Sequence, residues 1–254
     1  MRPAPITLAD RVSRTPLWRA TVLLFLLALA WDASGLDRPV MHWLADGGGF
    51  SLRHHWLLER MLHDAAHDLS VGLYLALVVM IWLPRGPLRQ LTRMQRLEIA
   101  SGTTLAIVLI GVLKRLSLSS CPWDLAEFGG VAIYVSHWTW GLGDGGPGHC
   151  FPGGHVSSAF AFVALALPWL AATEPAQRRH GQLLLWGVLA AGLLLGLTQT
   201  LRGAHFPSHT AWTAWLCWTA ALVNRQVFAW VRAPADSRTA GAGTLPINTD
   251  QINS

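Results

Sequence analysis

The sequence predicts an all-α, polytopic membrane protein built as a six-transmembrane-helix bundle. Hydrophobic residues make up 52% of the 254-residue chain and charged residues only 13%, a low share for a soluble domain. The hydrophobic residues gather in stretches of about 20 residues, the length that a helix needs to cross the hydrocarbon core of a bilayer. Fourteen tryptophans against two tyrosines fit a chain with much surface at the membrane–water interface.

Six apolar stretches are candidate spans. The third and fifth are the clearest, whereas the second and sixth have more polar ends. The first has an alternative interpretation as a signal peptide, because Ala28-Leu-Ala30 resembles a cleavage site. The stretches cover roughly residues 17–34, 66–84, 97–116, 155–173, 181–201 and 207–230.

The spans define one membrane domain over residues 17–232. It is preceded by a short N-terminal segment, residues 1–16, that we expect in the cytoplasm. It is followed by residues 233–254, whose polar composition predicts a disordered cytoplasmic tail. The outer loops between spans are residues 35–65 and 117–153.

Positive charges predict the orientation of these spans. Thirteen of the 19 lysines and arginines lie on one side, which the positive-inside rule assigns to the cytoplasm. In a bacterium the opposite face is the periplasm, so we expect an inner-membrane protein whose outer loops face the periplasm. No basic stripe with interleaved aromatic residues appears, so the net charge of +5 does not indicate nucleic-acid binding. The thirteen are Arg2, Arg11, Arg14, Arg19, Arg85, Arg89, Arg93, Arg96, Arg178, Arg179, Arg225, Arg232 and Arg238.

Two groups of chemically useful residues lie where apolar segments meet the second outer loop. Lys114, the only lysine of the chain, ends the third segment, and Pro152-Gly153-Gly154-His155 opens the fourth. Glycines before a helix let backbone amides approach an anion closely, and a histidine there can donate a proton. The ordinary alternative is a snorkelling lysine and a glycine turn with an interfacial histidine.

A third group surrounds the start of the sixth segment. Pro207 suits the first turn of a helix, which places His209 inside that helix and His205 just before it. The planar fork of Arg202 matches phosphate oxygens, and a neighbouring histidine can attack phosphorus. Two alternatives stay open, a charged helix end with interfacial imidazoles and a pair of metal ligands four residues apart.

His63 and His67 also have the spacing of metal ligands on one helix face. No third ligand is evident near them in the sequence. A solvated helix end is therefore the favoured interpretation of this pair.

Taken in order, the three groups resemble the signatures of the type 2 phosphatidic acid phosphatase superfamily of integral membrane lipid phosphatases. Those signatures are lysine-x6-arginine-proline, proline-serine-glycine-histidine and serine-arginine-x5-histidine-x3-aspartate. The resemblance covers roughly residues 65–230. The matching residues are Lys114-x6-Cys121-Pro122 with cysteine for arginine, Pro152-Gly153-Gly154-His155 with glycine for serine, and His205-x3-His209 with histidine for aspartate.

The departures from the third signature leave a choice of register. The family's arginine would fall at Gln199, and Arg202 lies three residues later on nearly the same helical face. We infer that Arg202 takes over phosphate binding. The other register would make His209 the nucleophile with Thr213 in the aspartate position, but its spacing from Arg202 is one residue too long, so His205 is preferred.

The resemblance implies a role for each site residue. His205 would attack phosphorus and form a phosphohistidine, His155 would protonate the leaving oxygen, and His209 would orient His205. No metal or cofactor is needed in this scheme. Phosphoryl oxygens would be held by Lys114, Arg202 and the backbone amides of Gly153 and Gly154. The arginine that Cys121 replaces leaves three alternatives open: a different head group, slower turnover, or compensation by Arg115 or an outer-loop arginine.

The resemblance also implies the partners, a bilayer and a membrane lipid phosphate on its periplasmic face. Candidate substrates are undecaprenyl pyrophosphate, phosphatidic acid, phosphatidylglycerophosphate and lipid A. One alternative is a phosphotransferase that moves a phosphoryl group from undecaprenyl pyrophosphate to another lipid. A further alternative is a non-catalytic lipid-phosphate binder or transporter. Nothing in the sequence indicates an oligomeric state.

Cys121 and Cys150 flank the second outer loop, each beside one of the three groups. In an oxidising periplasm we expect them to form a disulfide that ties the first group to the second. The alternative is a pair of free thiols.

Overall fold

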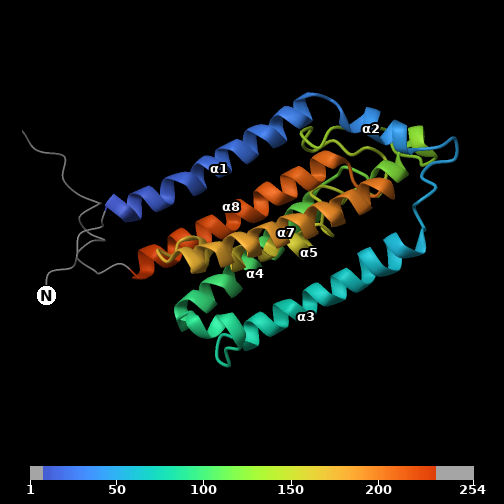
Figure 1. Cartoon of the computed structure of the whole chain (residues 1–254). Coiled ribbons are helices and arrows are strands. Elements are labelled where there is room, and N and C mark those ends of the chain that lie inside the picture. Colours follow the sequence, from blue (N-terminus) through green and yellow to red (C-terminus); the bar gives the residue numbers. More distant parts are fainter. Residues whose placement is uncertain (1–7, 233–254) are drawn as a thin grey trace, which may run out of the picture.

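The computed structural model describes residues 8–232, with side chains described from residue 17 onward (Figure 1). This part of the chain is helical, and it contains no β-strand beyond isolated bridges. Its α-helices are α1 (Leu8–Ala33), α2 (Asp37–Leu44), α3 (Ala66–Val79), α4 (Arg93–Leu116), α5 (Ser157–Phe160), α6 (Leu167–Leu170), α7 (Pro175–Leu201) and α8 (Pro207–Arg232). Its other helical segments are the π-helix η1 (Leu57–Ala65) and the 3₁₀ segments η2 (Gly86–Gln90), η3 (Pro122–Asp124), η4 (Ala126–Phe128) and η5 (Ala161–Leu165).

Helical structure occurs in each of the six predicted ranges, and the all-α prediction is confirmed for the described residues. The fourth range is broken into the short pieces α5, η5 and α6. By length and apolar composition, α4 and α7 can each cross a membrane, and residues 17–44 make a third span if their bent helix pair counts as one. Six spans therefore stay a prediction, and the predicted tail at residues 233–254 lies outside the described part.

The core of the bundle forms where α4 and α8 pack side by side (Figure 1). Ile110 of α4 and Cys217 of α8 share a buried apolar cluster with Phe160 of α5. Near the start of α4, the buried carboxylate of Glu98 accepts hydrogen bonds from two arginines of α8, at 2.9 Å and 2.6 Å. Removing either arginine would leave part of a buried charge uncompensated, so this contact fixes the pairing of the two helices.

Glycines bring α7 close to its neighbours. A Cβ atom at Gly192 would lie 2.2 Å from the ring of Phe160, and one at Gly196 would lie 2.4 Å from Thr210 of α8. Small residues of this kind let helix backbones approach closely. They set the position of the C-terminal end of α7, where the residues of the third sequence group begin.

The N-terminal end of α8 is capped by another helix. The carboxylate of Asp37, at the start of α2, accepts hydrogen bonds from the backbone amide of Ser208 at 3.0 Å and from the Ser208 hydroxyl. Trp31 donates a further hydrogen bond to the same carboxylate at 2.8 Å. An acidic group at a helix N-terminus satisfies free amides and complements the helix dipole. Residues 31–37 thereby hold the beginning of α8 in place.

Asp144 anchors the glycine-rich stretch 141–148 of the second outer loop. This side chain is 5% exposed, and it accepts hydrogen bonds from the backbone amide of Ser120 at 2.5 Å and from the Ser120 hydroxyl at 2.8 Å. The glycine-rich end of the second outer loop is thus fastened to the beginning of the same loop, just after α4.

Candidate active site

His205 and His209 lie together at the junction of α7 and α8. As the position of Pro207 predicted, α8 begins at this proline, so His205 precedes the helix and His209 is in its first turn. The two Nδ1 atoms are 3.3 Å apart, and both side chains are buried, with exposed fractions of 4% and 1%. One Nδ1 must carry the proton of this contact. When it is that of His205, its Nε2 is left unprotonated and able to act as a nucleophile.

The environment of His205 keeps its imidazole neutral. Burial, followed by the nearby positive charge of Lys114, lowers the pKa of His205 to about 3. A neutral imidazole has a free lone pair at any pH at which the protein is expected to work. The ammonium group of Lys114 would also stabilise negative charge brought next to His205.

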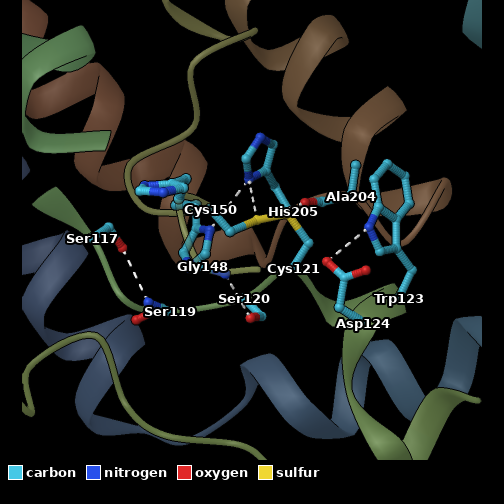
Figure 2. Close-up of a disulfide and its surroundings, with 12 residues drawn as sticks. Ser117, Ser119, Ser120, Cys121, Trp123, Asp124, Gly148, Cys150, Ala204 and His205 are labelled. Atoms are coloured by element: carbon cyan, nitrogen blue, oxygen red, sulfur yellow. Dashed lines mark hydrogen bonds between the residues drawn. A yellow bond between two sulfur atoms is a disulfide. The ribbon is translucent and has the colours of Figure 1, made fainter. Parts of the chain in front are cut away.

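A disulfide joins Cys121 to Cys150 beside this imidazole (Figure 2). Sγ of Cys150 lies 3.3 Å from Nδ1 of His205. These three residues are the one group of potential metal ligands found among the described residues. Because metals bind the thiolate form of cysteine, sulfurs that are bonded to each other do not provide such a site.

Lys114 packs directly against the glycine turn of the second group. A Cβ atom at Gly154 would lie 3.1 Å from Cδ and 3.4 Å from Nζ of Lys114, so the ammonium group sits over the backbone at this position. The carbonyl of Gly153 accepts a hydrogen bond from the hydroxyl of Thr213 at 3.3 Å. Within the described part of the chain, the amides of Gly153 and Gly154 donate no hydrogen bond, which leaves them available to an anion.

His155 follows this turn and contacts the first outer loop. Its Nε2–H donates to the backbone carbonyl of His63 at 2.7 Å, and the two rings stack with centroids 3.6 Å apart. Burial, followed by the charge of His63, lowers the pKa of His155 to about 4. In this arrangement His155 is neutral at neutral pH.

Arg202 is buried at the end of α7, with 4% of its surface exposed. Its Nε donates to the carbonyl of Arg53 at 2.9 Å, and its Nη2 donates to the carboxylate of Glu59 at 3.2 Å. Its Nη1 has no partner among the described residues, and neither has Nε2 of the buried Gln199. Unpaired buried donors are costly, so both atoms are candidates for binding an acceptor group of a ligand.

The structure thus gathers the sequence-predicted groups around one point. Lys114 packs against Gly154, and the hydroxyl of Thr213 in α8 donates to the carbonyl of Gly153, so the first group and the helix of the third group both contact the second. Arg115, the suggested compensating cation, is exposed. His63 in the first outer loop, one of two histidines with the spacing of metal ligands on one helix face, contacts the carboxylate of Asp64 at 2.7 Å. Among the described residues it belongs to no group of potential metal ligands.

Three residues of the site were not predicted from the sequence. Arg53, Glu59 and His63 contact Arg202 or His155 from roughly 90 to 150 positions away, and no local pattern in the sequence signals such a contact. In the sequence, Gln199 stands out only because it occupies the place of the family's arginine. Its buried and unpaired Nε2 indicates a role in binding more strongly, but that burial is known only from the tertiary structure.

Comparison with known families gives one clear result. A family model described as the PAP2 superfamily matches residues 96–233, more than half of the chain and a range that includes all three sequence groups. This match confirms the family resemblance inferred from the three groups. Neither the curated proteins nor the solved structures gave a match to this chain.

Proposed function

Because the chain belongs to the PAP2 superfamily, whose members are phosphatases, we propose that it is an integral membrane lipid phosphatase. In this proposal it removes a phosphate group from a lipid at the periplasmic face of a bacterial inner membrane. The observation that carries the proposal is the contact of 3.3 Å between the Nδ1 atoms of the buried His205 and His209. It leaves the opposite nitrogen of a neutral imidazole free to attack.

The proposed reaction proceeds in two balanced steps. Nε2 of His205 forms a bond to phosphorus and the bond to the lipid oxygen breaks. His155, protonated to the imidazolium form next to the anionic substrate, transfers a proton to that oxygen and is left as the neutral imidazole. Water then attacks the phosphohistidine, releases phosphate and returns a proton to His155. Lys114 and the amides of Gly153 and Gly154 stabilise the charge on the phosphoryl oxygens, which is the main contribution of proteins to phosphoryl transfer.

An apolar cavity between α3 and α7 supports a lipid as the substrate. The cavity has a volume of about 580 Å³ and lies between α3 on one side and α5, η5 and α7 on the other. Its lining runs from Leu62 of η1, the neighbour of His63, along α3 to Met80 at the end of that helix. At 1.5 Å per residue this is a length of roughly 27 Å, close to the thickness of the bilayer core. We propose that one hydrocarbon chain of the substrate occupies this space.

The exposed apolar faces of the helices support the membrane location. Leu23 and Leu27 of α1, Leu75 of α3 and Leu193 and Leu197 of α7 are each at least 50% exposed. Large apolar surfaces of this kind mark contact with a membrane or a partner. With α4 and α7 as spans, we propose that the remaining helical ranges complete six spans. The Cys121–Cys150 disulfide fits outer loops in an oxidising periplasm.

The test is phosphate release by the purified protein in detergent from a panel of lipid phosphates, with EDTA present and with His205→Ala as the comparison. We expect release that requires His205 and survives EDTA. Transfer of the phosphoryl group to an acceptor lipid without release of phosphate would identify a phosphotransferase. Lipid binding without either reaction, unchanged in His205→Ala, would identify a non-catalytic binder.

A further inference from the structure

Two hydrogen bonds of Arg202 go to acceptors from the first outer loop. The carbonyl oxygen of Arg53 and a carboxylate oxygen of Glu59 occupy Nε and Nη2 of its guanidinium, at 2.9 Å and 3.2 Å. A phosphate group offers the same chemistry, since its oxygens are acceptors that pair with adjacent guanidinium donors. The loop therefore takes up two of the three nitrogens with which Arg202 would hold a phosphoryl group.

The same loop also forms a hydrogen bond with His155, the proton donor of the proposed reaction. The carbonyl oxygen of His63 accepts the Nε2–H of His155 at 2.7 Å, and the stacked ring of His63 covers the His155 ring. In the proposed reaction this proton goes to the leaving oxygen, which must lie within hydrogen-bond reach of His155. The leaving oxygen and the His63 carbonyl cannot both accept this proton.

Residues 53–63, called the strap below, are weakly held apart from these contacts. None of the residues in η1, which forms most of the strap, is buried. A π-helix is a rare conformation that tends to occur at functional sites, and segments with few buried contacts open at low cost in free energy. One end is anchored by the guanidinium of Arg53, which stacks on Trp123 at 4.5 Å. The strap is therefore fastened at one end and held over the site by its acceptors.

We propose that the strap is a gate, which closes the site by placing oxygen acceptors on Arg202 and His155 and withdraws when a phosphate group binds. The inference rests on the proposed function, because phosphate oxygens and the leaving oxygen must replace the strap at these donors.

The helix that carries the strap also lines the apolar cavity. Leu62 lies in the strap, and Ala66 and Leu69 follow it in α3, and all three border the cavity. A hydrocarbon chain entering between α3 and α7 contacts this helix directly. Lipid entry is thereby coupled to release of the strap, so the site opens for a phosphate that is attached to a lipid.

Hydrogen exchange of the full-length protein tests the gate, with orthovanadate as the phosphate analogue. With vanadate bound, we expect peptides covering residues 53–63 to exchange at least about threefold faster, while peptides around Gly153 and His205 exchange more slowly. Slower exchange around His205 with unchanged or slower exchange in the strap would overturn the gate alone. No protection around His205 would overturn the proposed function, and the gate with it.

A charge-neutral variant gives a second, independent measurement. Glu59→Gln weakens the contact with Arg202, so we expect half-inhibition at an orthovanadate concentration about 3- to 10-fold lower than for the wild type. The matched control is Glu127→Gln, since Glu127 pairs with Arg38 at 2.7 Å in the outer loops, away from the site. This control should leave vanadate inhibition unchanged. Weaker inhibition of Glu59→Gln, with an unchanged melting temperature, would show that the strap supports the site and does not close it.

Discussion

Nδ1 of His209 lies 3.3 Å from Nδ1 of His205, in the position where the family signature has an aspartate. An imidazole can orient the neighbouring ring, but it stabilises the imidazolium less than a carboxylate does. We expect His209→Ala to lower kcat by roughly 10- to 100-fold with a smaller effect on KM. His209→Asp should retain more activity than His209→Ala. An unchanged kcat in His209→Ala, measured by phosphate release, would remove His209 from the mechanism.

The contact between Lys114 and Gly154 predicts a steric effect on catalysis. In Gly154→Ala the new Cβ would lie 3.1 Å from Cδ of Lys114 and would push the ammonium away from the phosphate position. We expect kcat/KM to fall by at least about tenfold, because small displacements of a charged group weaken transition-state binding. The melting temperature should change little. Gly143→Ala is the control, since a Cβ there meets nothing within 4 Å, and it should behave like the wild type.

The disulfide between Cys121 and Cys150 closes a loop across a sequence separation of 29 residues and lies against His205. Its loss should destabilise the protein by about 2–4 kcal/mol and lower activity by loosening the wall of the site. Adding a reductant to the wild type should therefore lower the melting temperature measured in detergent. The double variant Cys121→Ser, Cys150→Ser provides the control. A reductant that lowers its melting temperature by the same amount would assign the effect to something other than this bond.

The lowered pKa values of His155 and His205 predict how stability depends on pH. The unfolded chain binds protons at these histidines near pH 6.5, whereas the folded protein binds them only near pH 4 and pH 3. Between these values the unfolded state holds more protons, so stability should fall as the pH falls from about 6.5 toward 4. Melting temperatures across this range measure the effect. His205→Gln, which cannot titrate, should show a shallower decline, and an equally steep one would contradict the assignment.

The apolar cavity predicts selectivity for long hydrocarbon chains. A Cβ at Gly187 of α7 meets no atom within 4 Å, and this residue lines the apolar cavity. Gly187→Trp should fill part of the cavity and raise KM for lipid phosphates with long chains several-fold, while leaving short-chain analogues unaffected. Equal effects on both substrates would indicate general damage to the fold. An unchanged KM for the long-chain lipid would place the chain elsewhere.

The sequence by itself determined the helical class, the approximate helix positions and the family. Runs of apolar residues, the proline at the start of α8 and the order of three short signatures are local patterns, and each can be read without knowing what packs against what. The same patterns predicted that Lys114, His155 and His205 belong to one site. Each of them is part of a signature, so the prediction needed only their positions along the chain.

Only the tertiary structure decided which groups touch. The contacts of Arg202 with Glu59 and of His155 with His63 join segments more than 90 residues apart, and no periodicity encodes such a pairing. The unpaired amide of Gln199 likewise becomes informative only when its burial is known. The physical reason is that hydrogen-bond partners and exclusion of water are properties of packed helices, whereas the sequence patterns report only which residues can enter a helix.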